Sequence, residues 1–261
     1  MAAMLELNKV STHYLSGGRI IKAVDNVDMR INEGEVVGLV GESGSGKSTL
    51  ALSVLRLIDP PGKVYGEVLW NGINLLNLSP QNMRRIRGEE ISMVFQDPFS
   101  SLNPVIKIGE QIAEVFRFHK KLSRRKAWEA AIKVLDLVHI KDPGERVNDY
   151  PHQFSGGMKQ RVAVAMAYAL SPKLLIADEP TTALDVTMQK AILELLKELK
   201  TGMLFITHNI ALVSEMCSRM YVMKDGRIVE QGDTREVLGN PKDAYTKRLI
   251  DSYKEINLGL D

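Results

Sequence analysis

Residues 41–49 read GESGSGKST and carry the glycine, lysine and hydroxyl spacing of a phosphate-binding loop. They follow an apolar run at 35–40 that is typical of a strand, and they lead into residues 48–58, which have the pattern of a helix. In such a loop the glycines let backbone N–H groups face phosphate oxygens, Lys47 adds a positive charge near the outer phosphates, and Ser48 offers a hydroxyl to Mg²⁺. The sequence therefore predicts a nucleotide site rather than a glycine-rich turn that only caps a helix. The residues predicted to bind nucleotide in this loop are Gly41, Ser43, Gly44, Gly46, Lys47, Ser48 and Thr49.

Two adjacent acids end the apolar run LLIADEP at 174–180. Ligands of α/β sheets bind beside the carboxyl ends of the strands, where the chain leaves the sheet and both acids can face the same crevice. Asp178 is then suited to the Mg²⁺ shell, and Glu179 to orienting or deprotonating an attacking water. The alternative is a pair of solvated acids at a strand end, but the phosphate loop upstream favours the catalytic interpretation.

Two further polar residues follow strand-like segments. His208 comes directly after MLFIT at 203–207, where its imidazole could hydrogen-bond a γ-phosphate, and a core or helix-capping histidine is the alternative. Gln96 ends another apolar run and leads into a helical region. We expect Gln96 to join both the Mg²⁺ shell and the water shell, and so to report the γ-phosphate to that region.

Ser155, Gly156 and Gly157 begin a second helix-like segment, at 156–170. A serine hydroxyl, bare N–H groups and a helix N-terminus make a second anion site. One nucleotide needs only one such cradle. The sequence therefore predicts that two subunits grip one nucleotide, each with a different cradle.

The elements that must position these residues alternate between strands and helices, which indicates a parallel α/β sheet. Residues from about 97 to 170 are helical only and are expected to form an insertion in that sheet. The expected strands are 4–14, 20–31, 35–40, 64–72, 89–96, 174–177, 203–207, 219–223 and 227–232, and the expected helices are 48–58, 108–118, 123–138, 156–170, 187–200 and 209–217.

The composition limits the possible partners. The 261 residues include 34 Lys and Arg against 32 Asp and Glu, a balance that argues against a nucleic-acid-binding protein. The single cysteine, Cys217, excludes an intrachain disulfide and favours a cytosolic setting. No secretory signal is visible, and the apolar runs are shorter than the roughly 20 residues of a spanning helix. Any connection to a membrane is expected to pass through a partner.

The motifs together resemble an ATP-binding cassette (ABC) transporter ATPase, most closely the subfamily that energises import of oligopeptides, dipeptides or nickel. The resemblance implies a P-loop NTPase (RecA-like) parallel sheet with an N-terminal antiparallel β subdomain and an inserted α-helical signature subdomain. It implies a nucleotide-binding domain over 1–240, with the helical insertion at about 97–170, and a short C-terminal helical extension over 241–261. The segments that carry the resemblance, in chain order, are GESGSGKST, FQDPFSSLNP, FSGGMKQR, LLIADEP, ALDV and ITHN.

The resemblance also implies roles for residues outside the phosphate loop. Tyr14 would stack on adenine, with His13 as the alternative and simple packing on the sheet as a third possibility. Asp185 would lie at a dimer interface near the opposite nucleotide, or cap the following helix, or both. Residues 97–111 would contact a short helix of a membrane subunit.

The implied cofactors are ATP and Mg²⁺. Two cassettes would close on two ATP molecules and reopen after hydrolysis. The implied partners are a second ABC ATPase, identical or homologous, two transmembrane permease subunits and, indirectly, an extracytoplasmic solute-binding protein, with no nucleic acid. The chain would lie at the cytoplasmic face of the cell membrane. Peptides are the expected solute, and nickel or oligosaccharides remain alternatives.

The sequence departs from the family pattern at two places. Met158 stands where a glutamine is commoner in the family. The chain also ends soon after YTKRLIDSY, so we expect a short member of the family or a trimmed chain, without an iron–sulfur cluster. Three rival functions fit the sequence less well: a soluble non-transport ABC ATPase, a P-loop kinase or GTPase, and a non-catalytic regulatory module. A non-transport ABC ATPase would need sustained heptads, cysteine pairs or a second phosphate loop, and the sequence has none of these. A kinase or GTPase would not explain the Ser-Gly-Gly helix start, and a non-catalytic module would not explain the Asp178–Glu179 pair.

Overall fold

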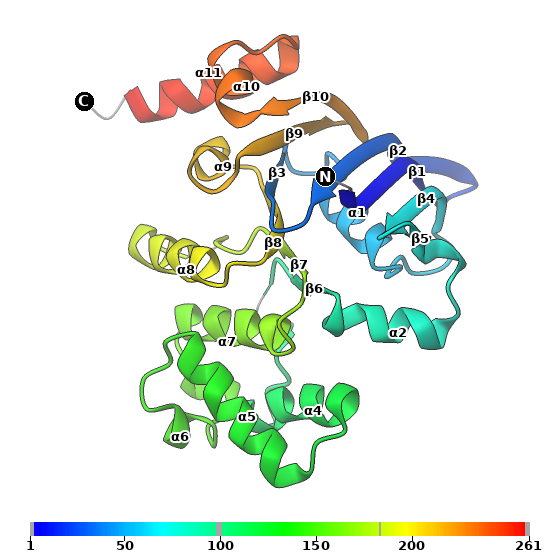
Figure 1. The fold of residues 1–261 in the computed structure, drawn as a ribbon. Coiled ribbons are helices and arrows are strands. Elements are labelled where there is room, and N and C mark those ends of the chain that lie inside the picture. Colours follow the sequence, from blue (N-terminus) through cyan, green and yellow to red (C-terminus); the bar gives the residue numbers. More distant parts are fainter. Residues whose placement is uncertain (1–2, 98–100, 183, 259–261) are drawn as a thin grey trace. The chain divides into compact units, whose positions relative to one another are not determined.

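The structure, a computed structural model, describes residues 3–97, 101–182 and 184–258. The chain forms two compact units, each with its own strands and helices (Figure 1). The first unit joins Met1–Met83 to Gly202–Asp261, and the second is formed by Arg84–Thr201. Within the described ranges, no helix combines the length and the apolar character needed to cross a bilayer.

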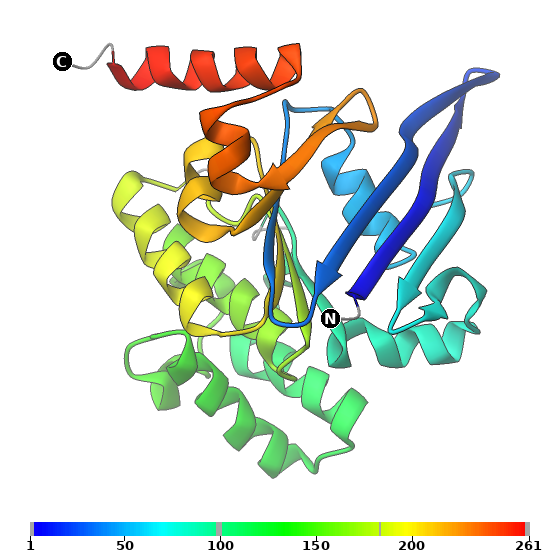
Figure 2. The ribbon, with the colours of Figure 1, turned by 45° about the horizontal axis from the view of Figure 1, so that its top comes forward.

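An antiparallel sheet opens the first unit, with its strands in the order β2–β1–β4–β5. The strands are β1 (Ala3–Ser16), β2 (Arg19–Asn32), β4 (Lys63–Trp70) and β5 (Ile73–Asn74). β1 and β2 form a long hairpin (Figure 2). One face of this sheet is apolar because residues such as Leu5, Val10, Val27 and Ile31 are fully buried. The N-terminal antiparallel sheet predicted from the sequence is confirmed.

The first unit also contains a mainly parallel group of strands. β3 pairs in parallel with β8 on one side and with β9 on the other, and β10 pairs antiparallel with β9. β8 is buried along its whole length and β3 along most of its length, which accounts for their continuous apolar sequences. The bounds are β3 (Val36–Val40), β8 (Gly202–Thr207), β9 (Arg219–Lys224) and β10 (Arg227–Asp233).

The helices of the first unit are α1 (Lys47–Val54), α9 (Ile210–Met216), α10 (Thr234–Gly239) and α11 (Ala244–Leu258), with a 3-10 turn η1 at Leu75–Asn77. The prediction that the first helix continues to residue 58 is wrong. Arg56 adopts a left-handed backbone with φ +52°, and its guanidinium donates to the carbonyls of Leu75 and Leu78. These bonds tie the chain to the η1 region and end the helix.

The second unit contains the parallel pair β6 (Ile91–Val94) and β7 (Leu174–Asp178) together with a group of helices. α5 packs against both α4 and α7, and α7 also contacts β6 and α8 (Figure 1). α2 (Pro80–Glu89) starts in the first unit and continues into the second, with a break in helical geometry at Arg87 and Gly88. The other bounds are α4 (Ile108–Lys120), α5 (Arg124–Leu137), α6 (Pro143–Arg146), η2 (Pro151–Gln153), α7 (Gly156–Tyr168) and α8 (Val186–Glu198).

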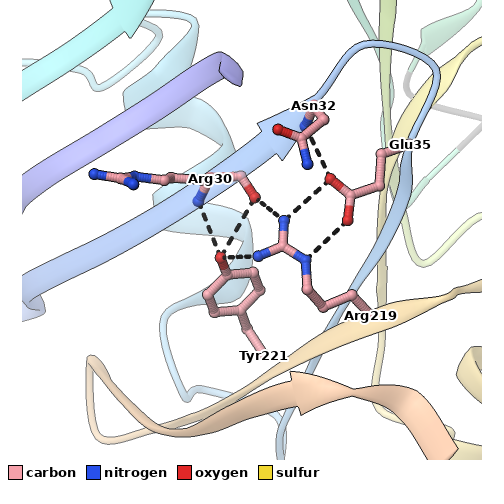
Figure 3. Close-up of polar contacts among 5 residues, drawn as sticks. All are labelled: Arg30, Asn32, Glu35, Arg219 and Tyr221. Carbon is pink, nitrogen blue, oxygen red and sulfur yellow. Dashed lines mark hydrogen bonds and ion pairs between the residues drawn. The ribbon is translucent and has the colours of Figure 1, made fainter. Parts of the chain in front are cut away.

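A charged network joins β2 and β9 to Glu35, the residue directly before β3, within the first unit (Figure 3). Arg219 forms two hydrogen bonds to the Glu35 carboxylate, at 2.8 and 3.0 Å, and a third to the hydroxyl of Tyr221 at 3.0 Å. That hydroxyl accepts the Arg30 N–H, and Glu35 accepts the Asn32 N–H. Burial alone would raise the pKa of Glu35, but the bonds from Arg219 and Asn32 outweigh it and hold the pKa below its usual range.

The only cysteine in the sequence lies at the end of α9. Cys217 is buried, and α9 packs against β3 and β8 where Gly38 leaves room for the side chain of Val213. Burial raises the pKa of Cys217 to about 12, so its thiol stays protonated at neutral pH. Cys217 is therefore a small core residue of the first unit.

Candidate functional site

The phosphate loop leaves β3 at Val40 and enters α1 at Lys47, as the sequence predicts. Gly46 precedes the helix with φ +105°, and an added Cβ there would collide with the carbonyl oxygen of Ala23. An added Cβ at Gly41 would collide with the carbonyl oxygen of Met223. Both positions need glycine because neighbouring backbone occupies the space that a side chain would take. The loop is thus fixed by the strands around it.

Lys47 is buried inside the loop that it terminates, with 5% of its surface exposed. Its ammonium group donates to the carbonyl oxygens of Gly41 at 2.8 Å and Glu42 at 2.9 Å. The backbone therefore curls around a positive charge, an arrangement that suits an anionic ligand. Ser48 and Thr49 are half-buried in the first turn of α1, whereas Ser43 and Gly44 are exposed.

His208 lies at the same sheet edge as the phosphate loop. In the parallel pairing of β3 with β8, Val40 stands opposite Thr207, so Gly41 and His208 both leave the sheet at neighbouring strand ends. His208 is exposed there. The register thus brings together two of the predicted site residues that are far apart in sequence.

Tyr14 and His13 both lie near the end of β1 and line one cavity of about 310 Å³ on the antiparallel sheet. His13 packs against Tyr65 with ring centroids 5.0 Å apart, while Tyr14 is half-buried close to Gly62. Both rings therefore line a cavity in which a flat ligand could stack.

Glu179 and Gln96 meet in the second unit. β6 and β7 run in parallel with Val94 opposite Ala177, so the residues that follow the two strands share one sheet edge. The Gln96 amide donates to the Glu179 carboxylate at 3.4 Å, and the Thr182 hydroxyl donates to the same oxygen at 2.8 Å. Glu179 has φ +46°, an uncommon backbone for a residue with a side chain. The turn therefore aims this carboxylate in a defined direction.

Thr182 contributes to the position of the Glu179 carboxylate, and the sequence did not predict this role. It closes a turn in which its N–H donates to the Glu179 carbonyl at 3.1 Å, while its hydroxyl holds the carboxylate. The spacing of three residues between Glu179 and Thr182 could have indicated a turn in which the threonine bonds the acid. We infer from these two bonds that Thr182 fixes the orientation of Glu179.

Asp178 ends β7 and is almost fully buried. Within the described ranges, no group of three or more His, Cys, Asp or Glu side chains is placed to hold a metal. Mg²⁺ is commonly held by one or two carboxylates and the phosphates of a substrate, so the buried Asp178 carboxylate is a donor of the kind that Mg²⁺ takes.

Ser155 caps α7 and is exposed, with its hydroxyl accepting the Met158 N–H at 3.3 Å. At Gly156 an added Cβ would meet no atom within 4 Å, whereas at Gly157 it would collide with the Met188 side chain of α8. Gly157 therefore lies against the flexible end of the Met188 side chain. Ser155 and Gly156 remain available on the surface of the second unit.

Asp185 caps α8 by accepting the Met188 N–H at 2.9 Å, which is the structural role considered for it from the sequence. Its side chain is exposed. In the predicted docking segment 97–111, residues 98–100 lie outside the described part of the chain. The rest is organised by buried Gln111, which accepts the Asn103 N–H and donates to the carbonyls of Asn103 and Ile106, while Val105 is 79% exposed.

Comparisons with known proteins agree with this geometry. The family model described as ABC transporter matches residues 24–182. A probable peptide ABC transporter ATP-binding protein of Sinorhizobium fredii is 47% identical over 98% of this chain and 78% of its own length. The oligopeptide transport ATP-binding protein OppD of Bacillus subtilis is 46% identical over 95% of this chain and 71% of its own length. The dipeptide transport ATP-binding protein DppD of Escherichia coli is 45% identical over 97% and 79%.

Solved structures support the same assignment. A dimeric ATP-binding cassette in a post-hydrolysis state with ADP and Pi superposes with a TM-score of 0.79 at 32% identity, over 89% of this chain and 99% of that one. The predicted P-loop NTPase fold and the resemblance to oligopeptide and dipeptide import ATPases are confirmed. The chain therefore belongs to the ABC transporter family and is an ATP-binding ATPase of that family.

Proposed function

We propose that this chain is the ATP-hydrolysing subunit of an importer of oligopeptides or dipeptides. The observation that carries this proposal is the 45–48% identity to peptide-transport ATP-binding proteins along 95–98% of the chain. We assign residues 1–240 to the nucleotide-binding domain, with a helical subdomain at about 97–170, and residues 241–261 to a short C-terminal extension.

The phosphate loop binds the phosphates of ATP through its backbone N–H groups and Lys47. Ser48, Gln96 and Asp178 would hold Mg²⁺, which neutralises phosphate charge when it is bound. Glu179 accepts a proton from the attacking water, or orients it, while Thr182 keeps the carboxylate directed. His208 donates a hydrogen bond toward the γ-phosphate. The fixed backbone at Glu179 supports its assignment as the catalytic carboxylate.

A second cassette completes the nucleotide site. Ser155, Gly156 and Gly157 of one subunit contact the γ-phosphate held by the phosphate loop of the other, and Asp185 lies at that interface. The exposure of Ser155 and the open space at Gly156 support this assignment. Tyr14 stacks on the adenine, with His13 as the alternative.

ATP closes the pair of cassettes because it contacts both subunits only in the closed state. Hydrolysis removes that bridge, and the pair reopens. Residues 97–111 pass the motion to two permease subunits, which hold the chain at the cytoplasmic face of the membrane. An extracytoplasmic solute-binding protein delivers the peptide to the permeases.

The variant Glu179→Gln tests the catalytic step. It keeps the size and the hydrogen bond to Thr182 but cannot take a proton, so we expect kcat to fall by about a hundred-fold or more while ATP binding remains. Mg-ATP should then trap the closed pair of cassettes, as size-exclusion chromatography with light scattering would reveal. The pairing is measured on the purified full chain with its partner cassette, and the rate of hydrolysis on the complex with its permease subunits in proteoliposomes.

Glu198→Gln is the matched control, because Glu198 forms an exposed ion pair with His139 in the same unit. It should hydrolyse ATP at the wild-type rate. Wild-type turnover in Glu179→Gln would contradict the assigned role. Uptake of labelled peptide, measured beside uptake of nickel and of an oligosaccharide, tests the solute.

A further inference from the structure

The C-terminal helix of the first unit contacts the phosphate loop through one hydroxyl group. Tyr245 lies in the first turn of α11 and is only 6% exposed. Its hydroxyl oxygen accepts the backbone N–H of Glu42 at 2.9 Å, although the two residues are 203 positions apart. Glu42 is the second residue of the phosphate loop. The contact therefore joins the last helix of the described chain to the start of the nucleotide site.

This contact acts on a peptide group that Lys47 also uses. The N–H of Glu42 and the carbonyl of Gly41 belong to one planar peptide unit. Lys47 donates to that Gly41 carbonyl at 2.8 Å, and Tyr245 accepts from the N–H at the other end. A planar group held at both ends cannot rotate without breaking one of the bonds. The tyrosine hydroxyl thereby fixes the direction of an acceptor of the loop lysine.

Tyr245 is itself held firmly. The Asp243 carboxylate accepts the backbone N–H groups of Tyr245, at 2.8 Å, and Thr246, at 3.3 Å. The N–H of Asp243 in turn donates to Glu230 of β10 at 3.1 Å. Lys224 of β9 lies 5.1 Å from the centre of the Tyr245 ring. The hydroxyl therefore has a fixed position relative to the sheet that carries the loop.

The protonation of Tyr245 agrees with this contact. Burial raises the pKa of the phenol above its usual value, and the Glu42 N–H offsets this only in part. The neutral hydroxyl is therefore the form present at physiological pH. A cavity of about 550 Å³ lies beside the contact, lined by Glu42, Lys224, Tyr245 and Arg248 among others.

We propose that Tyr245 is a positioning residue of the nucleotide site, through which α11 sets the geometry of the phosphate loop and hence the affinity for ATP. The proposal rests on the proposed function in taking this loop as the site of ATP. Tyr245 touches no reacting atom and acts through the Gly41–Glu42 peptide on Lys47.

Tyr245→Phe in the full chain, with its partner subunits, tests the proposal. The phenyl ring keeps its packing and its contact with Lys224, and water from the adjoining cavity reaches the Glu42 N–H, so we expect the melting temperature without nucleotide to stay close to wild type. The hold on the peptide is lost. We expect the KM for ATP to rise about three-fold to ten-fold, in line with one neutral hydrogen bond, with kcat at saturating ATP changed less than two-fold.

Tyr221→Phe is the matched control. Tyr221 is also a buried tyrosine of the first unit, but its hydroxyl bonds Arg30 and Arg219 (Figure 3). We expect the opposite result for this variant, a lower melting temperature with the wild-type KM. A wild-type KM in Tyr245→Phe would overturn the proposal, and so would an equal rise of KM in both variants.

Lys47→Ala separates this inference from the function on which it rests. If Lys47→Ala binds ATP as wild type does, the loop is not the ATP site and both proposals fail. If Lys47→Ala loses ATP while Tyr245→Phe keeps the wild-type KM, the ATP site stands and only the positioning role is wrong.

Discussion

Two glycine-rich segments start helices in this chain, and they acquire their shapes in different ways. The segment at 41–49 is shaped by neighbouring backbone, since the carbonyls of Met223 and Ala23 occupy the space beside Gly41 and Gly46. The segment at 155–157 is an ordinary helix start in which a serine hydroxyl caps α7. Backbone atoms of the same unit exclude a side chain at Gly41 and Gly46, whereas at Gly157 only the flexible end of the Met188 side chain is in the way.

The difference teaches which part of the site is complete within one chain. The phosphate loop contains Lys47, whose positive charge can balance that of bound phosphates, and residues of the first unit alone hold the loop in place. For Gly156 the described residues supply no steric reason to exclude a side chain. A need for glycine at this position would therefore point to a ligand or a second molecule, as the proposed nucleotide shared by two subunits entails.

Gly46→Ala gives the largest expected effect on the first segment. A methyl group would collide with the Ala23 carbonyl in a backbone of φ +105°, so we expect the free energy of unfolding to fall by about 3 kcal/mol, with loss of ATP binding. Gly44→Ala is the control, since its φ is +82° with open space around it, and it should cost only about 1 kcal/mol. Chemical denaturation measures both. Equal costs would contradict the role of the neighbouring backbone.

Arg219→Gln tests how much the ion pair between Arg219 and Glu35 stabilises the strands beside the phosphate loop. Losing the paired hydrogen bonds to Glu35 should cost about 2 kcal/mol of unfolding free energy near neutral pH. The folded pKa of Glu35 lies below its usual value of 4.5, so this contribution is present above pH 4.5 and is lost as the pH falls through the folded pKa. Denaturation at several pH values should show the variant approaching wild type below that point. A gap that stays constant into acid would refute the assignment.

Ser155→Ala compares the structural and functional parts of the second segment. Loss of the cap on α7 should cost about 1 kcal/mol of unfolding free energy. Ser123→Ala removes the same kind of cap from α5 in the same unit and should cost about as much. Only Ser155→Ala should also weaken the ATP-driven pairing of cassettes, measured by light scattering in a Glu179→Gln background. Weaker pairing in both variants would point to a general structural effect.

Gly156→Ala has the smallest expected effect on stability. With open space at this position, the unfolding free energy should change by no more than about 0.5 kcal/mol. The pairing of cassettes under Mg-ATP should nevertheless weaken, because the methyl group enters the surface proposed to meet the other subunit's nucleotide. Full pairing in this variant would show that the glycine is not needed by the partner.

The sequence predicted the fold class and the order of most elements because motifs and apolar periodicity are local signals. The phosphate loop lies where expected, between β3 and α1, and parallel pairing places His208 at the same edge. The contribution of Tyr245 could not be predicted, because its contact with Glu42 joins residues 203 positions apart and depends on where the last helix packs. The early end of α1 likewise depends on bonds from Arg56 to distant carbonyls.

The buried Gln111 has a consequence for whatever binds the segment that carries Val105. The Gln111 side chain makes three hydrogen bonds within this segment, two with Asn103 and one with Ile106, and these bonds need no partner protein. Association at such a pre-formed surface loses little conformational entropy, since the loop is already ordered. A displacement of Val105 by a bound partner would also move α4, because Gln111 belongs to α4 and is hydrogen-bonded to Asn103 and Ile106 on either side of Val105.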